Sequence, residues 1–205
     1  MTPTATLLWA LLAASAPPKR PNMPVGWTWP PSAAMRDAGT ACLERLDALE
    51  VTYARGPATN KIATPVVLPE FIVGGLALTP LKGKGAYPMD CQLAAGFAEV
   101  APALAELGVK ALRFRTLHEH RFVRKRGRPT KILSRHALGL AIDVFGVELT
   151  DGRVLEVERD WASETVLAAI AGVFAASPRF RGPLTPANDP HDHDDHVHLE
   201  AHLRI

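Results

Sequence analysis

The sequence predicts an α+β fold in which an antiparallel sheet packs with about three helices. Apolar residues recur at helical spacing mainly in the first half of the chain, whereas short alternating or β-branched runs dominate the second half. Helices early and strands late are typical of an α+β domain. The length of 205 residues, of which 47% are hydrophobic, suits one domain with a substantial core. We place that domain at residues 32–205.

Three segments carry the signals of helices. The first has leucines at a three-residue spacing, and the second is rich in Ala and Leu. Asp90 is placed to cap the start of the second helix and Gly108 to end it, while Pro102 is expected to kink or restart it. The three expected helices are residues 32–50, 90–107 and 161–176.

Short apolar runs bounded by Pro and Gly, or alternating with polar residues, predict the strands. Asp151-Gly152 lies between two apolar runs and is a strong hairpin signal. Residues 178–190 have no regular pattern and are expected to be irregular. The expected strands are residues 66–68, 71–73, 109–115, 141–147 and 197–200.

The N-terminus resembles a secretory signal peptide. The apolar run 7–16 ends in Ala14-Ser15-Ala16, a small-x-small cleavage pattern, although residues 1–6 contain no Lys or Arg. We therefore predict a signal peptide at residues 1–16 and an exported protein, periplasmic or extracellular; an ordinary buried helix or a disordered start are the alternatives. Residues 17–31 hold six prolines and are expected to form an extended linker. No apolar stretch is long enough to span a bilayer.

The net charge of +2 says little about partners, but positive charge gathers in residues 121–131. That cluster could meet an anionic cell-wall polymer or a substrate carboxylate, or form a solvated loop. A nucleic-acid partner is not expected, because no recognition-helix or finger pattern accompanies the charge.

Two cysteines, Cys42 and Cys91, leave two alternatives open. An exported chain could pair them in a disulfide, or they could be two buried thiols. A cysteine zinc site is not expected, because the chain has no Cys-x-x-Cys pair.

Two runs of polar residues suggest a zinc site in the sheet. Asp143 lies inside an apolar strand, where a carboxylate is costly unless a cation or hydrogen bonds satisfy it. His136 lies in the loop before that strand, and His196 and His198 are two apart, so they share one face of the last strand. If the last strand lies beside Asp143, then His136, Asp143 and His198 can bind one Zn²⁺ and leave a position open for water.

The other histidines are given no role in this site. His191, His193 and His202 are expected to face solvent, because one zinc ion needs fewer imidazoles than the tail contains. His118 and His120 are expected on a strand surface or at the edge of the core. A loose metal-sequestering tail, remote from the aspartate, is the alternative to a built site.

The chain resembles the bacterial extensin-like C-terminal domain proteins, within the lysostaphin / D-Ala-D-Ala metallopeptidase superfamily. The likeness rests on four motifs and covers roughly residue 42 to the end; it is faint before about residue 110. The motifs are Ser134-x-His136-x-x-Gly139-x-Ala141-x-Asp143, Asp151-Gly152, Asp160-Trp161 and Asp195-His196-Val197-His198. Close relatives carry more cysteines, including one just before the arginine ahead of the metal motif, where this chain has His120-Arg121.

The resemblance implies a zinc-binding α+β domain with His136, Asp143 and His198 as the metal ligands. It implies a catalytic role for Asp195 or for His196, and the sequence leaves open which of them is the base. Arg121 could bind a substrate carboxylate or polarise the scissile carbonyl; Arg124 competes for this role, and an exposed arginine in a basic loop is the alternative.

The function expected from this likeness is a zinc metallopeptidase or amidase acting on peptide bonds of bacterial peptidoglycan. The rival is a non-catalytic module that contains zinc and binds cell-wall peptides. Three ligands and an open fourth position would favour the hydrolase, whereas a fourth protein ligand would favour a structural site.

Overall fold

The computed structural model describes residues 22–56, 61–83, 87–125 and 128–205. The predicted signal peptide and the first part of the predicted linker lie outside the described residues. Within the described part of the chain, no helix is both long and apolar enough to cross a membrane.

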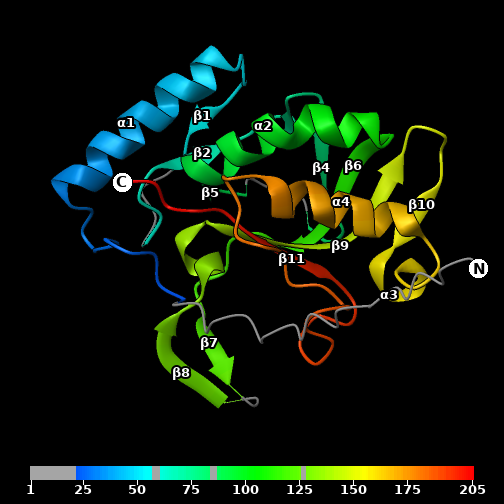
Figure 1. Cartoon of the computed structure of the whole chain (residues 1–205). Coiled ribbons are helices and arrows are strands. Elements are labelled where there is room, and N and C mark those ends of the chain that lie inside the picture. Colours follow the sequence, from blue (N-terminus) through cyan, green and yellow to red (C-terminus); the bar gives the residue numbers. More distant parts are fainter. Residues whose placement is uncertain (1–21, 57–60, 84–86, 126–127) are drawn as a thin grey trace, which may run out of the picture.

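The fold is α+β, as predicted, with the elements in the order shown in Figure 1. The helices are α1 (Ala33–Ala48), α2 (Cys91–Glu106), the 3-10 turn η1 (Arg135–Leu138), α3 (Val157–Asp160) and α4 (Thr165–Ala176). The strands are β1 (Ala54–Arg55), β2 (Pro65–Val67), β3 (Ile72–Val73), β4 (Leu76–Pro80), β5 (Met89–Asp90), β6 (Val109–Thr116), β7 (Phe122–Lys125), β8 (Arg128–Leu133), β9 (Ala141–Leu149), β10 (Val154–Glu156) and β11 (Val197–Glu200).

The three expected helices form, with small differences at their ends. Asp90 caps α2, since its Oδ1 accepts a hydrogen bond from the backbone nitrogen of Gln92 at 3.0 Å, and Gly108 follows the helix with φ of 75°. α2 continues through Pro102, so the expected restart does not occur. The third helix begins at Thr165 instead of residue 161, because the residues before it form the separate short helix α3.

The central sheet is mixed, which corrects the expectation of an antiparallel sheet. Its strand order is β10-β9-β6-β4-β3, and β11 also pairs with β9. Strands β4 and β6 pair in parallel, while the other pairs of this sheet are antiparallel. The sequence did not predict β4. Because two parallel strands need a crossover connection, helix α2, which lies between β4 and β6 in the chain, supplies it.

Helices α2 and α4 lie along one face of this sheet (Figure 1). Ile142, Val144, Val197 and Leu199 are buried in the hydrophobic core of β9 and β11. Because successive side chains of a strand point to opposite faces, the residues between them, including Asp143, lie on the other face. A disulfide joins Cys42 of α1 to Cys91 at the start of α2, which decides between the two alternatives for the cysteines.

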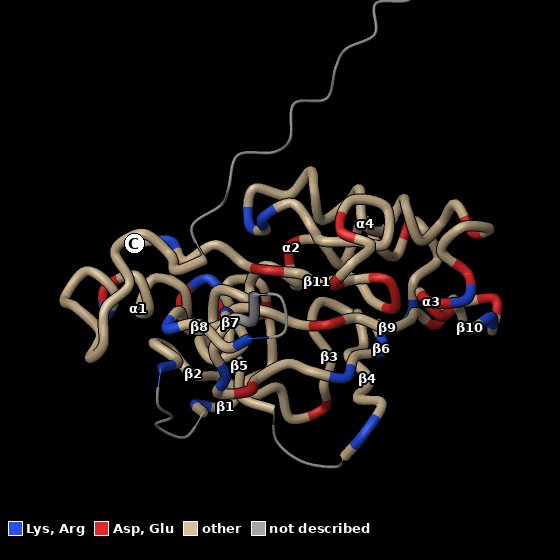
Figure 2. Tube along the Cα trace, turned by 90° about the horizontal axis from the view of Figure 1, so that it is seen from below, with Lys and Arg blue, Asp and Glu red and all other residues tan. Residues whose placement is uncertain are grey.

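The basic cluster forms an antiparallel hairpin of β7 and β8, not the loop considered from the sequence. Figure 1 shows this hairpin extending away from the sheet and its helices. Lys and Arg lie along it, whereas acidic and basic residues are mixed around α3 and β10 (Figure 2). The hairpin begins directly after Arg121, so its base adjoins the site described next.

Candidate metal centre

His136 is held by the turn η1, which leads into β9. Ser134 caps this turn, since its Oγ accepts a hydrogen bond from the backbone nitrogen of His136 at 3.3 Å. Gly139 ends the turn with φ of 65°, a left-handed conformation that favours glycine. A Cβ at Gly139 would lie 2.7 Å from the backbone nitrogen of Asp90, so this glycine is also required by close packing. The turn thus fixes His136, which is 0% exposed.

Asp143 and His198 face each other from neighbouring strands. In the antiparallel pair β9–β11, the Cα atoms of these two residues are directly opposite. Side chains in such positions lie on the same face of the sheet and within contact range. The chain therefore folds its last strand against the middle of β9 and joins two residues that are 55 positions apart.

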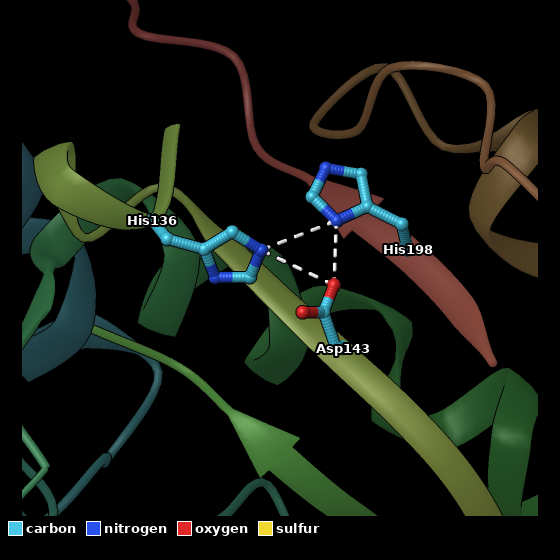
Figure 3. A group of neighbouring side chains, drawn as sticks. All are labelled: His136, Asp143 and His198. Carbon is cyan, nitrogen blue, oxygen red and sulfur yellow. Dashed lines mark hydrogen bonds and ion pairs between the residues drawn. The ribbon is translucent and has the colours of Figure 1, made fainter. Parts of the chain in front are cut away.

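Three side-chain atoms converge at this place (Figure 3). His136 Nε2 lies 3.1 Å from Asp143 Oδ1 and 3.3 Å from His198 Nδ1, and His198 Nδ1 lies 2.7 Å from Asp143 Oδ1. In the described part of the chain, these three residues are the group of His, Cys, Asp and Glu side chains that could hold a metal ion.

The opposite nitrogen of each imidazole has an acceptor as its partner. His136 Nδ1 lies 3.1 Å from the carbonyl oxygen of Leu117, and His198 Nε2 lies 3.2 Å from Glu200 Oε1. Since these oxygens can only accept, each histidine places an N–H there, and in its neutral form it turns a lone pair toward Asp143. In this neutral form three acceptor atoms face one another, and a proton on a ring nitrogen, which then donates to Asp143, or a cation between the three atoms relieves their repulsion.

This arrangement fits a divalent metal. Ligands at about 2.0–2.1 Å from a tetrahedral zinc ion stand roughly 3.3 Å apart, close to two of the three distances observed here. Metal-binding histidines commonly donate their second N–H to a carbonyl or carboxylate, as both do here. The geometry therefore supports a metal site with three protein ligands.

The protonation states of the group follow from burial and from these partners. Burial lowers the pKa of His198, but hydrogen bonds and charge from Asp143 and Glu200 outweigh it and raise the pKa to about 9. Burial raises the pKa of Asp143, but the hydrogen bonds from the two histidines hold it well below its usual range. Burial also raises the pKa of Glu200, and the hydrogen bond from His198 with nearby arginines brings it down to about 2. The site thus holds two carboxylates and attracts positive charge.

His196 lies beside the three converging atoms and is oriented by Asp195. Asp195 Oδ1 is 2.6 Å from His196 Nδ1, so the carboxylate accepts the proton of that nitrogen. In the neutral ring this leaves a lone pair on His196 Nε2, which lies 3.6 Å from Asp143 Oδ1. The ring stacks on Phe145, with centroids 4.9 Å apart and planes at 18°. Both sequence-predicted residues therefore reach the site, His196 directly and Asp195 through His196.

Arg121 also reaches the site. Its Nη2 lies 3.5 Å from Asp143 Oδ2, the carboxylate oxygen that does not face the histidines, and its Nη1 lies 3.4 Å from Glu119. The side chain is 44% exposed, so a charged donor is present where solvent reaches the site. The side chain of Arg124, the competing candidate, lies outside the described part of the structure.

His193 also lies at the site, although the sequence reading expected it to face solvent. Its ring centroid is 4.9 Å from that of His196 and 5.5 Å from that of His198, and its side chain is 13% exposed. Asp189 orients it, with Oδ2 3.1 Å from Nδ1. Burial and the neighbouring histidines lower its pKa. The available signal was a second Asp–His pair, Asp189 and His193, shortly before the pair Asp195 and His196 in the sequence.

The remaining histidines lie elsewhere or have no ligand role. His191 and His202 are exposed, as expected, and His202 also borders a separate cavity. Among the described residues, His118 Nε2 is the buried side-chain nitrogen or oxygen that lacks a hydrogen-bond partner.

The fold and the site define an α+β domain whose central sheet carries a buried histidine–aspartate–histidine group that could bind a metal ion. A family model described as "Extensin-like protein C-terminus" matches residues 40–204, and the chain belongs to this family. Comparisons with curated proteins and with solved structures found no match.

Proposed function

We propose that the protein is a zinc-dependent metallopeptidase that hydrolyses peptide bonds of bacterial cell-wall peptidoglycan. One observation carries the proposal: three side-chain atoms suited to a cation lie beside His196, whose Nε2 is 3.6 Å from Asp143 Oδ1. Metal-assisted hydrolysis needs this combination of a Lewis-acid site and an acid–base group. The motif likeness to the lysostaphin / D-Ala-D-Ala metallopeptidase superfamily supports the choice of metal and substrate.

The residues of the chain divide the work as follows. His136, Asp143 and His198 would hold the zinc ion, and the Leu117 carbonyl and Glu200 would fix the two rings. When bound, zinc supplies Lewis-acid chemistry, polarising a carbonyl and making water acidic near pH 7.

Proton transfer is assigned to His196. Its Nε2 takes a proton from the attacking water and returns it to the leaving amine, while Asp195 holds the ring in the required tautomer. Arg121 donates to the oxyanion or to a substrate carboxylate from the exposed side of Asp143. On this assignment His196 is the base, and Asp195 is a positioning residue.

Export of the protein is part of the same proposal. Peptidoglycan lies outside the cytoplasm, and the apolar leader with its small-x-small ending is typical of secreted proteins. The Cys42–Cys91 disulfide is compatible with an oxidising compartment.

A non-catalytic module that contains zinc and binds the cell wall is the second candidate. The deep burial of His136 and Asp143, and the hydrogen bonds behind each ligand, also suit a site that only stabilises the fold.

Digestion of purified peptidoglycan, with fragments identified by mass spectrometry, tests the proposal. The zinc-loaded protein should release peptide fragments. His136→Ala should lose both zinc and release. His196→Gln should keep zinc but release fragments about 10²–10⁴-fold more slowly, since it lacks only the acid–base group. His191→Gln changes an exposed histidine outside the site and is the matched control.

The two candidates predict different outcomes. If the zinc-loaded protein releases nothing that His136→Ala does not, but sediments with peptidoglycan, the binding module is supported. If His196→Gln is as active as the unchanged protein, the assignment of the base is wrong even where hydrolysis occurs.

A further inference from the structure

A second polar site lies behind the metal-competent group. A cavity of about 440 Å³ is formed by the segment 23–25, the turn 180–182 and the C-terminal residues 202 and 203, with Arg135 at its inner wall. Its volume lies within the range of about 300–1,000 Å³ that small-molecule sites occupy. None of the residues assigned to the proposed peptidase chemistry lines it.

Two guanidinium groups reach this cavity. Arg135 is 5% exposed, and burial lowers its pKa to about 10, so it remains a cation at neutral pH. The side chain of Arg181 is 10% exposed. Both pair with the same carboxylate, Glu200, whose Oε2 contacts Arg181 and lies 3.7 Å from the Nε of Arg135. One carboxylate, that of Glu200, thus pairs with one buried and one partly buried guanidinium group.

The arginines keep hydrogen-bond donors unused. Arg135 donates through Nε to the carbonyl of Asn22 and through Nη1 to that of Ala201, and Arg181 donates through Nη1 to Glu200. Among the described residues, no acceptor pairs with the Nη2 of Arg135 or with the Nε and Nη2 of Arg181, and none of these three atoms is a fully buried donor left without a partner. Water or a ligand in the cavity can therefore reach these donors, and a carboxylate placed there forms charge-assisted hydrogen bonds with them.

The positive field also acts on His202, a third polar residue of the cavity. Burial lowers the pKa of His202, and the charges of Arg135, Arg181 and Arg204 lower it further. The ring is therefore neutral near pH 7 and adds no positive charge, but it can donate or accept one hydrogen bond.

The rest of the lining is mostly apolar. Met23, Val25, Phe180 and Leu203 supply side chains without charge. An apolar wall beside two guanidinium groups matches a ligand that is anionic at one end and apolar at the other. Inorganic anions would satisfy the arginines but leave the apolar wall without a partner.

We propose that this cavity binds a small organic carboxylate with an apolar body, of the kind represented by an N-acylated amino acid. Its carboxylate accepts from the unused donors of Arg135 and Arg181, and its apolar part contacts Phe180 and Leu203. Glu200 joins the site to the metal-competent group, since its other oxygen accepts from His198.

Chemical-shift titration of the purified protein with N-acetyl-leucine tests the proposal. The protein is first stripped of metal by chelation and desalting, so that the carboxylate cannot bind a metal ion. We expect saturable one-to-one binding with a dissociation constant of about 1 mM or tighter, and shifts that include the side-chain Nε signals of the two arginines. N-acetyl-leucinamide, which lacks the charge, and inorganic phosphate, which lacks the apolar body, should each bind at least tenfold more weakly.

Three variants locate the site. Arg181→Gln should weaken binding of the acid at least tenfold. Val25→Glu adds a repelling charge at a residue that is 87% exposed, so it should fold normally and weaken the acid but not the amide. Arg204→Gln changes a nearby arginine that does not line the cavity and should alter binding by less than twofold.

The proposal is overturned if the acid and the amide bind equally, or if phosphate binds as tightly as the acid. It is also overturned if shifts do not saturate, or if Arg204→Gln weakens binding as much as Val25→Glu. Should Arg181→Gln fail to fold, Val25→Glu still decides the question. None of these outcomes depends on whether the protein hydrolyses peptidoglycan.

Discussion

Zinc should stabilise this protein through the three converging side chains of His136, Asp143 and His198. A ligand that binds only the folded state adds about 4.1 kcal/mol when its free concentration is 1,000 times its dissociation constant. For a domain of this size, each kcal/mol corresponds to roughly 2–4 °C in the unfolding midpoint. We therefore expect an increase of about 8–16 °C on addition of zinc at that excess, measured by calorimetry.

Asp143→Asn separates the charge of the site from its shape. The amide keeps the size of the side chain but removes the negative ligand that lies 3.1 Å from His136 and 2.7 Å from His198. Loss of a group hydrogen-bonded to a ligand typically weakens metal binding 10–100-fold, and loss of a ligand should exceed that. A 100-fold loss is about 2.7 kcal/mol, so the zinc-induced increase should fall to about 3–6 °C or less.

The matched control is His191→Ala, which removes an exposed histidine of the same tail. It should keep the full increase within about 1–2 °C, since roughly 0.5 kcal/mol is the usual range of a surface substitution. If Asp143→Asn keeps the whole zinc effect, or if His191→Ala abolishes it, zinc binds a loose histidine tract and the reasoning fails.

Three further predictions follow from the geometry. Without metal, the raised pKa of His198 stabilises the fold fully at a pH below about 6.5, the pKa of histidine in the unfolded chain, and about 3 kcal/mol of that stability should be lost as the pH rises to about 9, measured by urea unfolding. The zinc-loaded protein should not show this loss, because zinc binds the neutral ring. In the same assay Gly139→Ala should destabilise the protein by at least 1–2 kcal/mol, because φ of Gly139 is 65° and a Cβ would lie 2.7 Å from a backbone nitrogen. Gly172→Ala, which places a Cβ in open space on α4, should be neutral or should stabilise the protein by about 1 kcal/mol. Reduction of the Cys42–Cys91 disulfide, which closes a segment of 49 residues, should remove about 4 kcal/mol, and an unchanged midpoint with reductant would contradict this.

The arrangement of the converging group could be predicted because it depends on local rules. Strand alternation places Asp143 on the face opposite Ile142 and Val144, and a buried carboxylate there requires a cation or donors. The His-x-His spacing of the last strand supplies one ring on that same face. The pairing of the two strands was the one non-local assumption, and the register opposes Asp143 to His198 directly.

What could not be predicted depends on contacts between distant segments. β4 lacks a distinctive alternation, and its parallel pairing with β6 follows from the path of α2, which no local pattern encodes. The many basic residues in 121–131 interrupt the apolar alternation that predicts a strand, so β7 and β8 were not expected. The requirement for Gly139, which the sequence indicated only as part of a motif, comes from the turn and from contact with Asp90.

His193 illustrates the same limit within the site. It belongs to a segment without regular structure, so no periodicity determines where its side chain points. Its position follows from Asp189 on one side and from the rings of His196 and His198 on the other. The expectation that His193 faces solvent assumed that a ring not needed as a metal ligand lies outside the site. His193 shows that a ring can lie in the site without being a ligand.

The last strand explains why the metal-competent group and the carboxylate cavity lie so close together. Within β11, His198 and Glu200 are two residues apart, so they occupy one face of the strand at an interval of about 6.8 Å. Glu200 is the shared element: one oxygen accepts from His198, and the other holds the arginines of the cavity. Because an anion bound to the remaining donors of those arginines would lie beside Glu200 and carry the same charge, we expect a ligand of the cavity to act on the carboxylate that accepts from His198.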